Sequence, residues 1–531
     1  MVKIKFIPYI LLVIIFILLA WIDVGWSDLS ILGMKSMDEY VFHYSLLRMH
    51  EGVLNFELQQ IFSYVFYSYG FLFFLTNLVV AFPFLADAGS NMSIILPRIV
   101  TSTFAIITLF YLLKILQLQK ANILEQVILL FLIVLMPGFL IHAAWFNPNY
   151  MMAAFLCASI YYLSLDNNQY GKHFWIGIIL WVFAVAAAKI QAITFAPVLL
   201  GMIIWKLYKR EMNFYTAFRL ISITGIIILV IFVVTNPYII HPLGTKVWWN
   251  AFENNMLSNV TNHGALGNVT LWQKLSGAVG NSYLSMPLFA LMLLSAVWFI
   301  IKEWQSKQLT ANSLIAFYVL ANLIYLLFAV NKAWDSYYLA PLLMGTILII
   351  SAIKQIRVIP KTLVISWILL FSVIIIQSYS FGGSLVERIA LRLNDNRENE
   401  LLMLSHENTN FIKSYIDADT VLGASPKIVF DYVSLGLKYN QVRLINGPLR
   451  EKFFEEQNKY NSKVYKLLFR PANLILIMKD DIYFNEKRLS LRRDQKGYQH
   501  AKQLIERWKT GQGKFRLVAH NSKLLIFKRV K

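Results

Sequence analysis

Cysteine is almost absent from this chain of 531 residues, and the single one is Cys157. One cysteine excludes a framework of disulfide bonds within the chain and a zinc site built from cysteines. The sequence also lacks G-x-x-x-x-G-K-[ST], G-x-G-x-x-G and H-E-x-x-H, the usual motifs of soluble nucleotide-binding enzymes and zinc proteases. The sequence therefore gives no support to redox chemistry, to a soluble nucleotide-binding enzyme or to a zinc protease.

Charged residues are scarce as well, at 15% of the chain against 58% hydrophobic residues. This composition is typical of a multi-pass membrane protein. About 20 apolar residues cross a hydrocarbon core roughly 30 Å thick, and eleven apolar runs are candidates for crossings. They are Phe6–Trp21, Ile99–Leu116, Ile123–Ala143, Tyr150–Leu165, Phe174–Ala188, Ala192–Trp205, Ile221–Val234, Leu284–Ile301, Ser313–Val330, Tyr338–Ile353 and Leu363–Ile376.

The basic residues predict the orientation in the plasma (inner) membrane. Lys3 and Lys5 precede the first run, so we expect a cytoplasmic amino terminus; no small-residue cleavage site follows that run. The run Phe62–Leu85 is ambiguous, because it is apolar but rich in tyrosine and contains Pro83. We expect it to lie along the interface, since 14 basic residues then lie inside and only seven outside, up to residue 380.

The character of the chain changes near residue 385, where long apolar runs end. We expect an all-α polytopic membrane domain over 1–380, with outer loops at 23–95, 142–150 and 236–282, and a soluble extracytoplasmic α/β domain over 385–531. Residues 381–531 carry 28 basic and 16 acidic residues, which either attract anionic lipid or an acidic glycan or merely solvate the surface. No nucleic-acid partner is expected. The expected elements of this domain are strands at Thr420–Ala424, Asn473–Met478 and Lys523–Phe527 and helices at Pro426–Leu437 and His500–Trp508.

Acidic residues stand out in the first outer loop, where Asp38 and Glu39 precede a stretch in which aromatic and polar residues alternate. An acidic pair in the first turn of a helix often does no more than cap it. The pair is also the first candidate for acid–base chemistry, because long loops between crossings often hold function.

A second outer loop contains His142 and the turn Asn147-Pro148-Asn149. Asn-Pro forms turns, and proline suits the first turn of a helix, so a plain turn is one interpretation. Three basic residues, Arg98, Lys189 and Lys332, lie at the outer ends of expected crossings. Each either extends to the interface or serves a functional site, since ionisable groups at membrane depth are default functional candidates.

Four short motifs carry a resemblance to known proteins: Met37-Asp38-Glu39-Tyr40, Leu96-Pro97-Arg98-Ile99, Asn147-Pro148-Asn149 and Ser336-Tyr337-Tyr338-Leu339-Ala340-Pro341. In this order the chain resembles the GT-C class of integral membrane glycosyltransferases, particularly the protein O-mannosyltransferase and aminoarabinose transferase-like families. The resemblance covers roughly residues 1–380 and implies transfer of a sugar from a polyprenyl-phosphate carrier to a glycan, lipid or protein acceptor at the outer face.

The resemblance also implies roles for particular residues. Asp38 is expected to act as general base, with Glu39 beside it. Arg98, Lys189 and Lys332 are candidates for binding the donor phosphate. The family pattern usually has an aspartate where this chain has Asn149, which puts a second carboxylate or a metal ligand there in doubt. Candidates for the acceptor or sugar are His142, Asn147, Asn149, Trp248 and His263.

Two further expectations concern the long loop 236–282 and the alternatives to sugar transfer. We expect this loop to form a flexible lid, and a divalent metal has low probability, because the histidines show no paired ligand spacing. A polyprenyl-linked glycan polymerase or ligase, or a lipid-linked sugar flippase or transporter, would also have many crossings. The absence of an obvious repeat and the gathering of candidate residues in outer loops favour the transferase over a transporter.

Overall fold

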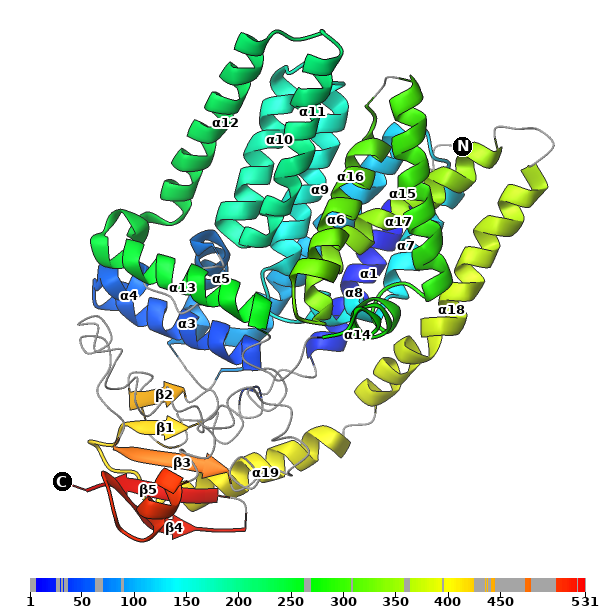
Figure 1. Ribbon diagram of the computed structural model, residues 1–531. Helices are drawn as coiled ribbons and strands as arrows, with labels where there is room; N and C mark the ends of the chain where they lie inside the picture. Colours follow the sequence, from blue (N-terminus) through cyan, green and yellow to red (C-terminus); the bar gives the residue numbers. More distant parts are fainter. Residues whose placement is uncertain are drawn as a thin grey trace.

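The computed structural model consists of a long helical bundle followed by a small β-sheet (Figure 1). The described residues are 6–24, 29, 32, 37–62, 70–86, 90–261, 269–306, 309–357, 363–393, 396–424, 435, 437, 441–444, 473–478, 503–522 and 524–530.

Twelve named helices form the bundle among these residues. They are α1 (Ile7–Val24), α6 (Met92–Leu118), α7 (Ile123–Val134), α8 (Pro137–Ala144), α9 (Asn149–Asp166), α10 (Lys172–Phe183), α11 (Ala196–Tyr208), α12 (Phe214–Thr235), α15 (Met286–Ser306), α16 (Ala311–Ile324), α17 (Leu339–Arg357) and α18 (Leu363–Leu393). Helix α9 packs against α6, α10, α16 and α17. Its small buried residues, which include Ala154, Cys157 and Ala158, allow this close approach between helices.

All eleven expected crossings fall mainly on helical residues, but the number of helices that can span a membrane is lower than expected. Within the described part of the chain, six helices are long and apolar enough, or seven if α7 and α8 form one broken span with a bend of 73°. The prediction of eleven spans is therefore not supported. The reason is physical: several apolar runs are divided by breaks, such as the one before Pro137, or form short helices.

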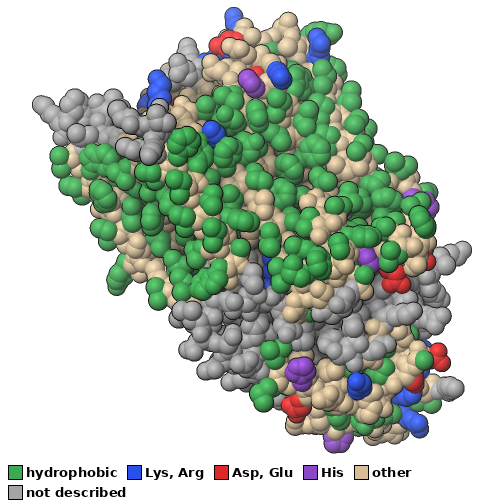
Figure 2. All heavy atoms as spheres, turned by 180° about the vertical axis from the view of Figure 1, so that it is seen from behind, with side chains coloured by type: hydrophobic (Ala, Val, Ile, Leu, Met, Phe, Trp, Pro, Cys, Tyr) green, Lys and Arg blue, Asp and Glu red, His purple; other side chains and the backbone are tan. Residues whose placement is uncertain are grey.

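The surface of the bundle is apolar where it faces outward. On α12, the side chains of Ile226, Leu229, Val230 and Val234 are 52–70% exposed. Figure 2 shows hydrophobic side chains covering much of one face of the helical part, with charged side chains toward its two ends. An apolar surface of this extent is unfavourable in water, so the bundle is that of a multi-pass membrane protein.

Shorter elements gather at one end of the bundle, between it and the sheet (Figure 1). They include α3 (Met37–Leu54), α4 (Leu58–Phe62) and α13 (Pro242–Thr261). The ambiguous run forms α5 (Phe71–Leu85), which has 15 residues and packs against α3 and α6. It falls below the length of the spanning helices, and residues 63–69 of the run lie outside the described part.

The segment 236–282, for which a lid was expected, is largely helical among its described residues. It contains η5 (Pro237–Ile240), α13, α14 (Leu271–Gln273) and the π-helical η7 (Lys274–Gly280). Two hydrogen bonds join the middle of this segment to Asn331: its backbone N–H donates to the carbonyl of Asn259 (2.7 Å), and the N–H of Val269 donates to its Oδ1 (2.6 Å).

After α18, helix α19 (Asn396–Lys413) leads to a five-stranded sheet of order β2-β1-β3-β5-β4. Its strands are β1 (Leu422–Ala424), β2 (Val442–Leu444), β3 (Leu474–Met478), β4 (Phe515–His520) and β5 (Leu524–Arg529). Strand β1 is parallel to β2 and β3, whereas β5 is antiparallel to β3 and β4. The three expected strands are confirmed, and residues 503–509 are helical where a helix was expected. The expected helix at Pro426–Leu437 lies almost entirely outside the described residues.

Candidate functional site

A cavity of about 570 Å³ lies where α3, the segment between α8 and α9, and the segment before α17 meet. It collects most of the residues that the sequence singled out. Its lining consists of Asp38, Glu39, Phe42, His142, Trp145, Phe146, Asn147, Pro148, Asn149, Lys189, Gly277, Ala278, Ser282, Ala333, Trp334, Asp335, Ser336 and Tyr337.

Asp38 lies in the first turn of α3, and its side chain is exposed at the cavity. Desolvation by the surrounding protein raises the pKa of Asp38 above its usual value. The positive charge of Lys189 opposes this shift, the negative charge of Glu39 adds to it, and His142 and Lys332 oppose it more weakly. The carboxyl group is thus poised to exchange a proton closer to neutral pH than an ordinary aspartate.

Glu39 is buried and holds three parts of the chain together. Arg98 on α6 donates two hydrogen bonds to it, Nε to Oε1 at 2.8 Å and Nη2 to Oε2 at 2.7 Å. The backbone N–H of Phe146 donates to the same Oε1 at 2.7 Å. A bidentate pair of this kind is geometrically specific, so Glu39 fixes α3 to α6 and to the segment after α8. Arg98 lies behind Glu39 and is not among the described residues that line the cavity.

An aromatic cluster supports the floor of the cavity. Phe42 packs edge-on against Phe73, Phe74 and Phe146, with ring centroids 5.6–6.0 Å apart. On the other side of α3, Nε2 of His43 lies 2.7 Å from Oγ of Ser93 on α6. Burial lowers the pKa of His43 to about 3, so this imidazole is neutral and structural. Together these contacts fix the start of α3, and with it Asp38.

Lys189 follows a π-helical turn, η3 (Ala184–Ala188), and precedes the 3₁₀-helical η4 (Ile190–Phe195). Its buried Nζ donates to Oδ1 of Asn149 at 2.7 Å and lies 5.0 Å from the centre of the Tyr337 ring. Burial lowers the pKa of Lys189 to about 7, an effect that the charge of Asp38 opposes. The irregular backbone at 184–195 therefore turns an ammonium group into the cavity at the end of a helical run.

Lys332 provides a second buried ammonium group near Asp38. Its Nζ lies 4.3 Å from the centre of the Trp334 ring and 6.0 Å from that of Tyr337, both of which line the cavity. Burial lowers the pKa of Lys332 to about 8, and Asp38 again opposes the shift. The faces of these aromatic rings stabilise cations, and Tyr337 contacts both lysines.

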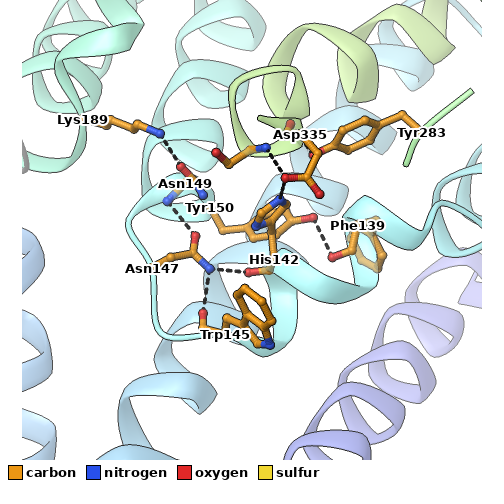
Figure 3. A network of polar contacts seen from close by, with 10 residues as sticks. Phe139, His142, Trp145, Asn147, Asn149, Tyr150, Lys189, Tyr283 and Asp335 are labelled. Atoms are coloured by element: carbon orange, nitrogen blue, oxygen red, sulfur yellow. Dashed lines mark hydrogen bonds and ion pairs between the residues drawn. The ribbon is translucent and has the colours of Figure 1, made fainter. Parts of the chain in front are cut away.

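The Asn147-Pro148-Asn149 segment is a turn whose side chains are engaged (Figure 3). Nδ2 of Asn147 donates to the carbonyls of His142 and Trp145, both at 2.7 Å, and its Oδ1 accepts from the N–H of Asn149 at 3.0 Å. Asn147 thus organises the turn, while the side chain of Asn149 contacts Lys189. The contacts of Asn147 hold the turn to the end of α8, and the contact of Asn149 holds it to Lys189.

His142 faces Asp335, which the sequence reasoning missed (Figure 3). Nε2 of His142 lies 3.3 Å from Oδ1 of Asp335, and the same oxygen accepts from the N–H of Ser336 at 2.8 Å. Burial raises the pKa of Asp335, but the hydrogen bond and charge of His142 and the hydrogen bond from Ser336 outweigh it, so the pKa lies below its usual value. Asp335 could have been found from the sequence, because it is an acidic residue only three positions after the candidate Lys332.

Arg98 and Lys332 lie next to the cavity without lining it, and two further candidates are not brought to it within the described part of the chain. Trp248 lies on α13 and packs against Phe232 and Phe252, with ring centroids 5.3 Å apart in each case. His263 lies outside the described residues. Among the described residues, no three His, Cys, Asp or Glu side chains gather into a group that would hold a metal ion.

Comparison with known proteins shows the fold. No protein-family model matches the chain, and no curated protein sequence matches it. Among solved structures, the chain is similar to ArnT from Cupriavidus metallidurans bound to undecaprenyl phosphate, with a TM-score of 0.56, 9% identity and 98% of each chain covered.

It is also similar to the archaeal oligosaccharyltransferase AglB from Archaeoglobus fulgidus in complex with an inhibitory peptide and a dolichol-phosphate. That likeness has a TM-score of 0.54 and 11% identity, and it covers 93% of this chain and 72% of AglB. A complex of the same oligosaccharyltransferase with zinc and sulfate has a TM-score of 0.51 and 12% identity, and it covers 93% of this chain and 71% of the other. The chain therefore has the GT-C glycosyltransferase fold, which confirms the resemblance seen in the sequence motifs.

Proposed function

We propose that this protein transfers a sugar from a polyprenyl-phosphate carrier to an acceptor hydroxyl at the outer face of the membrane, with Asp38 as general base. One observation carries the proposal: the Asp38 carboxyl group, whose pKa is raised, and the buried ammonium group of Lys189 line the same cavity, and the buried ammonium group of Lys332 packs on the Trp334 ring that also lines it. ArnT was solved with undecaprenyl phosphate and AglB with a dolichol-phosphate, which supports a lipid phosphate as the donor class.

In the proposed reaction, the acceptor oxygen attacks the anomeric carbon of the sugar and forms a new glycosidic bond. The bond between that carbon and the phosphate oxygen breaks, and the carrier leaves as its phosphate. Asp38 takes the proton of the acceptor hydroxyl, a contribution of typically about 10²- to 10⁴-fold. Lys189 and Lys332 stabilise the negative charge that develops on the leaving phosphate in a water-poor cavity.

In this proposal, the other residues of the site either hold Asp38, Lys189 and Lys332 in place or contact the sugar. Glu39 and Arg98 are positioning residues in this proposal, since each is paired with the other at bidentate distance. Trp145, Trp334 and Tyr337 line the cavity and offer aromatic faces on which a sugar ring packs. His142, Asn147 and Asn149 are candidates for orienting sugar or acceptor hydroxyls, whereas Trp248 supports α13 from outside the cavity lining.

The orientation in the membrane belongs to the same proposal. We place the cavity and the region 385–531 on the outer side and the amino terminus in the cytoplasm, because Lys3 and Lys5 precede the first apolar run and basic residues favour the cytoplasmic side. The sugar and the acceptor stay open, and a glycan polymerase or ligase would use the same donor chemistry.

Transfer from a polyprenyl-phosphate sugar in nanodiscs tests the proposal. Wild-type protein is expected to release the carrier phosphate and glycosylate an acceptor, whereas Asp38→Asn is expected to bind the carrier and transfer at least about 100-fold more slowly. Lys172→Met, at the exposed opposite end of α10 and η3 from Lys189, serves as the control. Normal transfer by Asp38→Asn would remove Asp38 as the base. Movement of the carrier between leaflets, without any release of sugar, would identify a flippase.

A further inference from the structure

Two of the positive charges that act on Asp38 come from lysine side chains, Lys189 and Lys332. Three carboxylates line the cavity, but two have cationic or histidine neighbours at close range: Glu39 with Arg98 and Asp335 with His142. Asp38 interacts electrostatically with both Lys189 and Lys332. Asp38 thus interacts with two ammonium groups, of which that of Lys189 lines the cavity and that of Lys332 does not.

The zinc-bound oligosaccharyltransferase of the same fold poses the question of whether a divalent ion would fit beside Asp38. Hard divalent cations are bound by several oxygen ligands, preferably carboxylates. Position 149 offers an amide oxygen in place of a carboxylate, and that oxygen already accepts a hydrogen bond from Nζ of Lys189 at 2.7 Å. No group of three potential ligands occurs among the described residues. The donor set does not fit a divalent ion.

Lys189 already engages the amide oxygen that position 149 could offer to such an ion. Its ammonium group donates to Asn149 and interacts electrostatically with Asp38, and the Tyr337 ring lies 5.0 Å away. A divalent cation entering here would meet two fixed positive charges and would have to displace Lys189 from Asn149. An ammonium group supplies one positive charge and three N–H donors, which suit a phosphate oxygen.

We propose that Lys189 replaces a divalent metal ion in this site, so that the sugar transfer proposed above proceeds without one. Lys189 holds the carrier phosphate as a fixed cation, Asn149 orients its Nζ, and Lys332 adds the second charge. The inference rests on the proposed function and defines its cofactor requirement. The uncharged amide of Asn149 and the buried charge of Lys189 then serve the same purpose, which is to hold the carrier phosphate without a metal ion.

The test uses the full-length protein in nanodiscs, depleted of metal with EDTA. Carrier binding is measured with undecaprenyl phosphate, and transfer is measured with a polyprenyl-phosphate sugar. EDTA is expected to leave both unchanged, and Mn²⁺ is expected to show no saturable binding by electron paramagnetic resonance. Loss of transfer in EDTA, with recovery on adding Mg²⁺ or Mn²⁺, would overturn the inference while leaving the proposed function intact.

Variants at the two positions sharpen the test. Lys189→Met is expected to weaken undecaprenyl phosphate binding by about 10- to 100-fold, the range for a hydrogen bond to a charged group. Asn149→Asp is expected to weaken it as well, because the new carboxylate would pair with Lys189 and cancel its charge. The control Lys172→Met lies on the same helical run and is expected to bind normally.

A double variant distinguishes two roles of Lys189: replacing a metal ion, or only supporting the structure. Asn149→Asp combined with Lys189→Ala supplies a second carboxylate and removes the ammonium group, so it is expected to gain Mn²⁺ binding that neither single variant shows. Unchanged carrier affinity in Lys189→Met would refute the inference. Failure of the wild type to transfer in any condition, despite normal carrier binding, would instead count against the proposed function.

Discussion

Arg98 and Glu39 form a buried, bidentate ion pair that joins α6 to the first turn of α3, with hydrogen bonds of 2.8 and 2.7 Å. The acidic pair Asp38-Glu39 is thereby divided into two roles. Glu39 points to Arg98 and the N–H of Phe146, whereas Asp38 opens to the cavity. Adjacent residues in the first turn of a helix lie on different sides of it, so one of them can anchor the helix while its neighbour faces the substrate space.

Glu39→Gln is expected to destabilise the protein, because it leaves the guanidinium of Arg98 buried and without its charge partner. Breaking a buried ion pair from one side costs about 3–5 kcal/mol. Thermal unfolding in detergent measures the loss, and the double variant Glu39→Gln/Arg98→Met should recover part of it, since glutamine still offers an oxygen to Phe146. A Glu39→Gln protein of native stability that has lost transfer would instead indicate a chemical role for Glu39.

The rate of transfer is expected to follow a bell-shaped dependence on pH. Activity requires Asp38 deprotonated, and its raised pKa moves the acidic limb upward from that of an ordinary aspartate. Activity also requires protonated lysines, whose pKa values of about 7 for Lys189 and about 8 for Lys332 make the rate fall as pH rises through this range.

A variant with a permanent charge checks which group sets the alkaline limb. Lys189→Arg keeps its charge at all accessible pH values, so the alkaline limb is expected to move toward the pKa of Lys332 even if the maximal rate drops. The measurement is kcat/KM between about pH 5 and 10. An alkaline limb that stays in place in both Lys189→Arg and Lys332→Arg would show that neither lysine controls it.

The contact between His142 and Asp335 is expected to couple two walls of the cavity. Their partly exposed pair is expected to contribute about 0.5–1 kcal/mol to stability. His142→Gln and Asp335→Asn should each lower transfer, because each releases the segment that carries Lys332 from the end of α8. The double variant should be no worse than the more impaired single variant. Fully additive losses would show that the two residues act independently.

Gly70→Ala is expected to disturb the approach of α5 to the π-helical turn before Lys189. A Cβ atom at Gly70 would lie 2.2 Å from the carbonyl carbon of Ala187, a backbone atom that cannot move aside. The expected cost is about 1–3 kcal/mol, together with weaker carrier binding through displacement of Lys189. Gly201→Ala in α11 meets nothing within 4 Å and is the control, with an expected gain of about 0.5–1 kcal/mol in unfolding free energy. Equal stability of the two variants would contradict the close approach.

The sequence by itself indicated the membrane fold, the helical segments and about half of the residues that line the cavity, Asp38, His142 and Lys189 among them. Apolar runs locate helices because hydropathy is a local property of the chain. The motifs at 38–39, 147–149 and 336–341 were found because their residues are neighbours in sequence. The number of spans was overestimated, because composition does not show where a run breaks, as α7 and α8 do with a bend of 73°.

Only the tertiary structure decided which charges meet. Arg98 pairs with Glu39, 59 positions away in the chain, a contact that the sequence did not predict. Asp335 was not singled out, yet it faces His142, and Lys189 reaches Asn149 because a helical run ends there in π- and 3₁₀-helical turns. Each pairing depends on how helices distant in sequence pack together, and an ionic contact between them leaves no periodic pattern along the chain.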